Sequence, residues 1–167
     1  MKKYIFAVSF AVLIVLILNI PMHGRFTISN GKTGEIAYID EIENVGEFVV
    51  SFRHSVNRTP VNEFIRIQGN KFIVYKTTFY SYGAGMPEFD GSGKQKVTID
   101  NGLVLIENID RELESFAYMV GTYADHIFSY GDKSIRLSEF IEPQNPAFFR
   151  IKKVTSFELI KYKLKRK

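Results

Sequence analysis

From Arg25 onward, apolar side chains recur at every second position in short runs, and no long helical stripe interrupts them. Such alternation is typical of strands that bury one face and leave the other in water. Turn residues separate the runs, as at Asn30-Gly31, Gly69-Asn70 and Asn101-Gly102. The pattern therefore predicts an all-β domain, either an antiparallel β-sandwich or a barrel-like sheet.

The apolar runs place candidate strands at residues 35–42, 47–53, 61–67, 72–80, 96–99, 103–107, 116–122, 126–130, 134–137, 148–154 and 157–164. A single helical turn is predicted over residues 110–115. The 167 residues show no internal repeat, so we expect one extracytoplasmic β-rich domain over residues 25–167, with a basic C-terminal tail.

The N-terminus carries the second clear pattern. Lys2 and Lys3 precede an apolar run from Tyr4 to Leu18, which is typical of a signal peptide or a signal anchor. No small-x-small cleavage site follows, which favours an uncleaved, single-pass transmembrane helix within residues 1–24; cleavage would give a secreted protein. The positive-inside rule places the domain outside the cytoplasm, attached to the cell membrane.

Composition excludes several classes of function. Lys and Arg exceed Asp and Glu by 22 to 18, and no nucleic-acid motif accompanies this small excess, so no nucleic-acid partner is expected. The chain has no cysteine, which rules out disulfides, thiolate catalysis and cysteine-type zinc sites. No cofactor is expected.

The segment from Phe52 to Phe64 carries a histidine and a carboxylate at the mouth of an apolar hairpin. With residues 57–60 as the loop, His54 lies directly opposite Glu63. Phe48, Val50 and Phe52 then share a face with that pair. Ser55 points to the other face, which argues against a serine–histidine nucleophile.

The next strand extends this prediction. A two-residue turn at Gly69-Asn70 would set Ile67 opposite Phe72 and Glu63 opposite Lys76. Three interpretations of the His54–Glu63 pair stay open: a structural clasp for the hairpin, a contact for a ligand or partner, and acid–base catalysis. A metal site that adds His126 is a further alternative.

Two further segments bear on function. Tyr82, Gly83, Gly85 and Pro87 form a glycine-containing loop, which is either a shaped turn or a loop that approaches a ligand through its backbone amides. The alternation of lysines with apolar residues over 161–167 predicts a protected last edge strand. The alternative is contact with anionic lipid headgroups or an acidic partner.

Several of these residues carry a resemblance to a known family. The chain resembles the domain of unknown function 1850 family over about residues 36–154. The matching residues are His54-Ser55-Val56, Thr59-Pro60-Val61, Glu63, Gly83-Ala84-Gly85-Met86-Pro87, Gly121-Thr122 and His126.

The resemblance implies a small exported or membrane-anchored bacterial or archaeal protein. Such proteins are commonly encoded beside the TAXI-type solute receptor and the fused permease of TRAP transporters. It therefore implies an accessory role in the uptake of organic acids such as dicarboxylates, with no established enzymatic activity. The partners implied are the membrane, a TRAP permease or solute receptor, and a small organic acid.

Taken together, residues and resemblance predict binding of a partner or ligand rather than catalysis. An extracytoplasmic enzyme or metal-binding domain that uses His54 and Glu63, or a purely structural envelope protein, is the alternative. No catalytic residue or metal ligand is assigned. The candidate contact residues are His54, Ser55, Glu63, Tyr82, Gly83, Gly85, Pro87 and His126.

Overall fold

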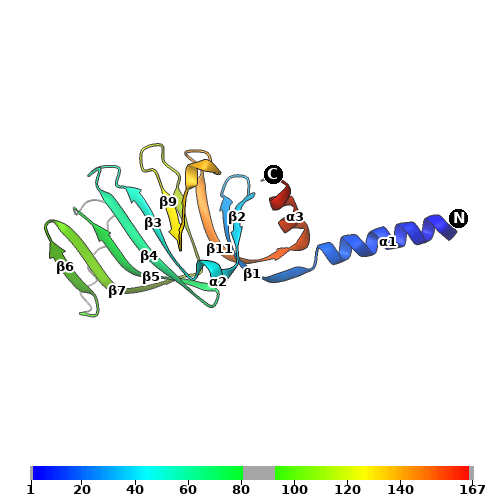
Figure 1. The fold of residues 1–167 in the computed structure, drawn as a ribbon, viewed down its shortest axis with the longest axis horizontal. Coiled ribbons are helices and arrows are strands. Elements are labelled where there is room, and N and C mark those ends of the chain that lie inside the picture. The colour runs from blue at the N-terminus through cyan, green and yellow to red at the C-terminus, as the bar shows by residue number, and fades with distance from the viewer. Residues whose placement is uncertain (1, 81–92, 166–167) are drawn as a thin grey trace.

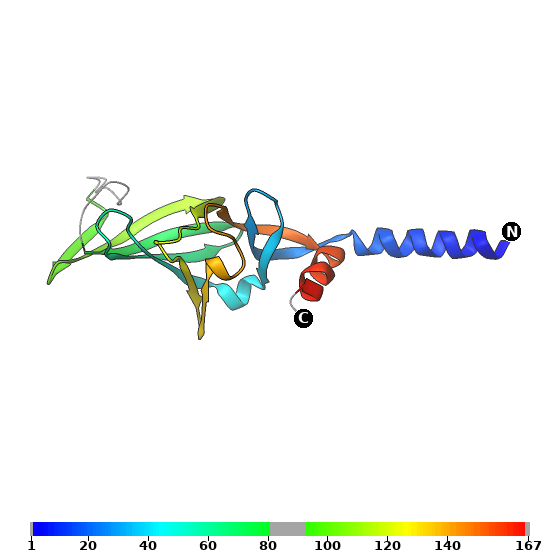
Figure 2. The ribbon, with the colours of Figure 1, turned by 90° about the horizontal axis from the view of Figure 1, so that it is seen from above.

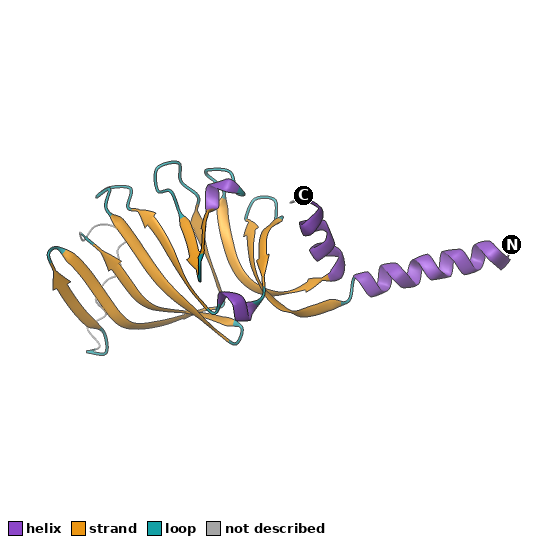
Figure 3. Cartoon of the chain, in the orientation of Figure 1, coloured by secondary structure: helices purple, strands orange, loops and turns teal. Residues whose placement is uncertain are grey.

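The computed structural model describes residues 2–80 and 93–165. Within these residues the chain forms two antiparallel sheets, which confirms the predicted all-β, sandwich-like domain (Figures 1 and 3). The four-stranded sheet has the order β2 (Ile36–Asp40), β1 (Pro21–Asn30), β11 (Pro146–Thr155) and β8 (Ser115–Met119).

The seven-stranded sheet contains most of the predicted hairpins. Its order is β10 (Lys133–Arg136), β9 (Ile127–Tyr130), β3 (Glu47–Arg53), β4 (Pro60–Gln68), β5 (Lys71–Phe79), β7 (Leu103–Leu113) and β6 (Lys96–Asp100). Two short helical segments, α2 (Ile42–Val45) and η1 (Leu137–Glu139), complete the connections of the domain.

Phenylalanine side chains from both sheets fill the space between them. Phe26 of β1 stacks on Phe128 of β9 with ring centroids 5.2 Å apart. Phe149 of β11 lies parallel to Phe48 of β3 at 6.1 Å. All four side chains are at most 2% exposed, so aromatic packing between the two sheets is a main source of the stability of the sandwich.

Strand β1 was not predicted, although it is central to its sheet. It pairs with both β11 and β2, with Phe26 opposite Ile151 and Asp40. Its sequence does show the alternation of a strand: Phe26 and Ile28, two positions apart, are both buried in the core. The strand begins at Pro21, inside the N-terminal segment predicted to end at residue 24.

The predicted N-terminal helix is present as α1 (Lys2–Leu18). It projects away from the sheets in both views (Figures 1 and 2), and it contains no buried residue. Within the described residues, no helix combines the length and the apolar character that crossing a membrane requires.

Two local predictions are wrong. Residues 157–164 form no edge strand, because they belong to the helix α3 (Ser156–Lys165). Residues 110–115 form no helical turn, because β7 continues to Leu113. Positive φ angles at Asn108 and Asp110 (58° and 46°) let the strand bulge and continue where its apolar alternation breaks.

Candidate functional site

The β3–β4 hairpin has a different register from the predicted one. Val50 lies opposite Glu63, and Phe52 lies opposite Val61. The prediction that His54 faces Glu63 is therefore wrong, since His54 lies one residue beyond β3. The predicted sorting of faces holds, because the register shifts by an even number of residues and so preserves the side-chain alternation.

His54 closes the hairpin turn instead. Its backbone amide donates to the Thr59 carbonyl and its carbonyl accepts from the Arg58 amide, both at 2.9 Å. Its Nδ1 accepts from the amides of Val56 and Asn57, both at 3.3 Å. These bonds lengthen the loop to residues 54–59, which explains the shifted register.

Ser55 is an exposed residue of this turn. Tyr82, Gly83, Gly85 and Pro87 lie outside the described residues.

Glu63 points between the two sheets and accepts a hydrogen bond from the Tyr118 hydroxyl of β8. Burial, reinforced by the Glu63 charge, raises the pKa of Tyr118 well above its usual value. Tyr118 therefore remains a donor at any physiological pH. The prediction that Glu63 faces Lys76 is wrong, because a bulge sets Glu63 opposite Thr77. The Lys76 ammonium instead lies 3.9 Å from the centroid of the Phe64 ring.

His126 joins this group through its ring. The imidazole stacks on Phe52 at 5.1 Å between centroids and lies 5.4 Å from the Tyr118 ring. It is 7% exposed, and its Nδ1 has no hydrogen-bond partner among the described residues. Burial lowers the pKa of His126, against the opposing influence of Asp125. The fold thus gathers Glu63 and His126 around Tyr118, one through its hydroxyl and the other through its ring.

The turn of His54 is tied to the loop that leads to His126. The Arg53 amide donates to the Ala124 carbonyl at 2.7 Å. Three of the predicted contact residues, His54, Glu63 and His126, therefore belong to one end of the sandwich. These three residues belong to three different segments of the chain, and the spacing of residues in the sequence could not show that the segments meet.

A cavity of about 230 Å³ opens on the inner face of the large sheet, next to Glu63. We call it the Arg111 cavity, after the cation at its rim. Six of its nine lining residues are apolar, and Glu63, Arg111 and Tyr118 supply the polar groups. Its lining residues are Phe52, Glu63, Ile65, Val74, Arg111, Leu113, Phe116, Ala117 and Tyr118.

The sequence patterns did not indicate Arg111 as a site residue. It lies opposite Val74 in the register of β5 and β7, on the inner face of the sheet. Arg111 forms no ion pair with another residue of the described ranges 2–80 and 93–165. The only signal in the sequence is a basic residue amid the acidic run from Asp110 to Glu114, and that run does not reveal the bulge that places the exposed Arg111 on the same face as Val74.

A second polar cluster joins the sheets away from the cavity. Tyr38 and Tyr130 share a hydroxyl–hydroxyl hydrogen bond of 2.5 Å, and Tyr130 donates to Asp40. Lys133 donates to the same carboxylate at 2.9 Å. Burial favours the neutral form of Asp40, but bonds from Tyr130, Asn44 and Lys133 outweigh it and hold its pKa well below the usual 3.8.

This cluster is a structural link between β2 and the β9–β10 hairpin. Its hydroxyls, carboxylate and ammonium pair with groups of complementary chemistry, as a partly buried network requires. No trio of His, Asp or Glu side chains within the described part of the chain is arranged to hold a metal ion. The predicted alternative of a metal site from His54, Glu63 and His126 is therefore not formed by these residues.

Fold and site together define a small antiparallel β-sandwich with an amphipathic cavity at the junction of its sheets. The chain belongs to the family described as a domain of unknown function (DUF1850), which matches residues 48–137. That segment contains Glu63, Arg111, Tyr118 and His126. No curated protein and no solved structure is significantly similar to the chain.

Proposed function

We propose that the protein is a membrane-attached accessory domain of a TAXI-type TRAP uptake system, and that it binds a small organic acid in the Arg111 cavity. The observation that carries this proposal is that Arg111 lines a cavity of mixed polar and apolar character and forms no ion pair with another described residue. A planar guanidinium is matched to a carboxylate, which it can bind through two parallel hydrogen bonds.

The cavity also limits the ligand. Its 230 Å³ lie below the range of about 300–1,000 Å³ that drug-sized ligands occupy. The walls from Ile65, Val74 and Phe116 suit a short carbon chain. Glu63 would repel a second carboxylate placed beside it, so the preferred acid directs one carboxylate to Arg111 and a hydroxyl or amine donor to Glu63.

Membrane attachment is supported by the surface of α1. Apolar side chains along the helix are widely exposed, from 42% at Ile14 to 79% at Tyr4. A solvent-exposed apolar surface of this kind marks an interaction with a membrane or another protein. The lysines at positions 2 and 3 orient the domain to the extracytoplasmic side.

A melting experiment on the detergent-solubilised full chain tests the ligand. A hydroxylated or amino-substituted short organic acid should raise Tm for the wild type, because binding to the folded state stabilises it. Arg111→Gln should abolish the rise. The matched control is Arg150→Gln, whose guanidinium lies over the Phe148 ring of the other sheet. Equal stabilisation of Arg111→Gln and wild type would refute the cavity assignment.

Co-purification tests the accessory role. A C-terminally tagged chain is isolated from native membranes in mild detergent, beside a Glu63→Gln variant that is shown to be folded. The expected result is a TRAP permease or solute receptor that accompanies the wild type and is reduced with the variant. Purification of the wild type without either partner would count against the accessory role.

A further inference from the structure

Helix α3 exposes apolar side chains on the face that points away from the domain. Phe157, Ile160 and Leu164 are 54%, 46% and 68% exposed. Their spacing of three and four residues places them on one stripe of the helix. A helix on a globular domain normally turns such a stripe toward the core, so this arrangement is reversed.

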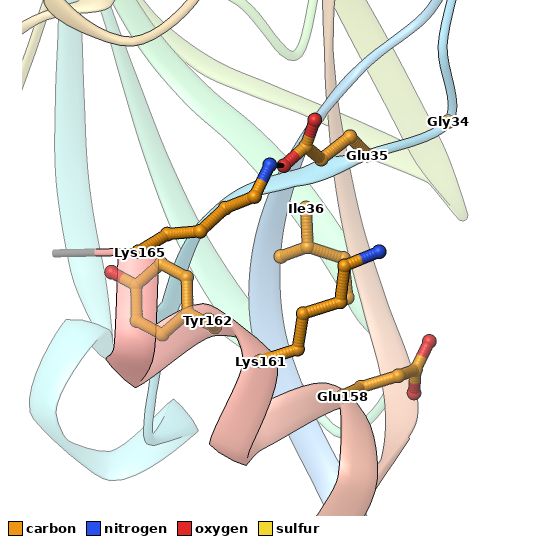
Figure 4. A pocket seen from close by; sticks show the side chains of 7 residues that line it. All are labelled: Gly34, Glu35, Ile36, Glu158, Lys161, Tyr162 and Lys165. Carbon is orange, nitrogen blue, oxygen red and sulfur yellow. Dashed lines mark hydrogen bonds and ion pairs between the residues drawn. The ribbon is translucent and has the colours of Figure 1, made fainter.

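The opposite face of α3 is held against β2, which fixes the stripe outward. Tyr162 and Leu159 are half-buried on that inner face. Figure 4 shows Lys165 directed toward Glu35, and Lys161 and Tyr162 beside Ile36, in the groove between α3 and β2. Lys165 makes an ion pair with Glu35, and this bond is the main cause of the lowered pKa of Glu35.

The start of α3 is fixed as well. Thr155 and Glu158 form a capping box, in which the Glu158 amide donates to the Thr155 hydroxyl at 3.1 Å and the Thr155 amide donates to the Glu158 carboxylate at 3.0 Å. Lys152 donates to the same carboxylate at 2.8 Å. The helix is therefore a docked element, and the outward direction of its apolar stripe is built into the fold.

The stripe lies at the end of the domain from which α1 departs (Figures 1 and 2). Thr155, the residue before α3, pairs with Pro21, just after α1. The Ser156 hydroxyl contacts the Met22 sulfur at 3.3 Å. Ile20 and Met22 at this junction are themselves 58% and 38% exposed, so apolar surface continues from α1 to α3.

Lysines border the stripe. At 100° per residue, Lys161 and Lys163 fall on its two sides, and both are exposed. The Lys161 side chain extends into the groove between α3 and β2, so Lys163 is the cation directed away from the domain. An apolar stripe with cations along its edges matches the interface of an anionic bilayer, where apolar groups enter the acyl boundary and ammonium groups meet lipid headgroups. A symmetric pairing of two copies through this face would bring like charges together.

We propose that the outward face of α3 docks on an anionic lipid bilayer through Phe157, Ile160 and Leu164, with Lys163 at the headgroups. The inference shares the membrane setting with the proposed function, and it does not depend on the Arg111 cavity. It adds a second lipid contact beside α1.

Fluorescent labelling tests the docking, and the absence of native cysteine makes each label unique. The full chain with Ile160→Cys carries a polarity-sensitive fluorophore and is reconstituted into phosphatidylcholine vesicles with or without phosphatidylglycerol. The expected result is a blue shift of emission that is larger in the anionic vesicles and falls with added salt. Ile99→Cys, 66% exposed on β6, is the matched control and should show no shift.

Equal emission from positions 160 and 99 in all vesicles would overturn the inference. A shift at position 160 that appears in detergent without vesicles and grows with protein concentration would also overturn it, in favour of a second copy. Phe157→Ser together with Leu164→Ser should reduce the shift at least severalfold, while Val56→Ser, at an exposed turn residue, should leave it unchanged.

A third label separates this inference from the proposed attachment through α1. A blue shift at Ile17→Cys without one at Ile160→Cys overturns only the docking of α3. A shift at position 160 alone supports α3 and refutes attachment through α1. The absence of both shifts refutes both statements.

Discussion

The Tyr118 hydroxyl of the four-stranded sheet donates a hydrogen bond to the Glu63 carboxylate of the seven-stranded sheet. This bond lies at the wall of the Arg111 cavity, and the imidazole of His126 lies beside the same tyrosine ring. This bond therefore links the two sheets and orients a carboxylate that lines the cavity.

Tyr118→Phe should lower the free energy of unfolding by about 1.5–3 kcal/mol, because it removes a hydrogen bond to a charged group and keeps the ring packing. Urea denaturation measures the change. In a double-mutant cycle with Glu63→Ala, the two substitutions should show coupling. Tyr123→Phe, at a 46% exposed tyrosine, should be additive with Glu63→Ala. Additivity for Tyr118 as well would contradict the role of this bond.

Asp40 should make stability sensitive to acid. Its pKa is lower in the folded chain than the usual 3.8, so the unfolded state binds the proton more readily. The contribution of Asp40 is present above about pH 4 and is lost as the pH falls toward the folded pKa. Asp40→Asn should cost about 1.5–3 kcal/mol at pH 7 and reduce the acid dependence.

Denaturation curves between pH 2 and 7 check this prediction. Asp100→Asn, at an exposed carboxylate of β6, provides the control and should keep the wild-type acid dependence. An unchanged slope for Asp40→Asn would show that the Tyr130 and Lys133 hydrogen bonds do not stabilise the ionised carboxylate.

His126 should oppose protonation in the folded state. Burial lowers its pKa below the usual 6.5, so folding favours the neutral ring. This stabilising contribution is complete above pH 6.5 and is lost as the pH falls through that value toward the folded pKa. NMR titration of the ring protons should give a midpoint below 6.5. His126→Phe should flatten the stability profile below pH 6.5, and a midpoint above 6.5 would refute the assignment.

Thr155→Ala should weaken the capping box of α3. Loss of an N-terminal cap costs about 0.5–2 kcal/mol, and amide hydrogen exchange should accelerate in the first turn of the helix. Lys163→Ala, at an exposed position of the same helix, should leave the exchange of that turn nearly unchanged. Equal exchange in both variants would show that the bonds between Thr155 and Glu158 do not hold the helix start.

The sequence predicts the strands of the large sheet well, because their alternation is regular. Strand β3 matches its predicted bounds, and the predicted pairing of Ile67 with Phe72 across Gly69-Asn70 is confirmed. Helix α3 was predicted as a strand because its lysines and apolar residues also alternate locally. The signal for a helix was the Thr155-Ser156-Phe157-Glu158 capping box.

The candidate site could be predicted only in part. Glu63 was identified, but its partner Tyr118 comes from the other sheet, and no local spacing joins the two. Arg111, although exposed, lies on the same face as Val74 because β7 bulges at Asn108 and Asp110, both with positive φ. Bulges of this kind depend on tertiary pairing, so the alternation of side chains could not reveal them.

The pairing of β1 with β11 has a consequence for how the chain reaches its native state. In that ladder Ile28 lies opposite Phe149, and the Thr27 hydroxyl donates to the Arg150 carbonyl, 123 positions later in the chain. The four-stranded sheet therefore cannot close until nearly the whole polypeptide has been synthesised. Contacts of such sequence separation slow folding. Until β11 is in place, the phenylalanines of the large sheet stay exposed and are a target for chaperones.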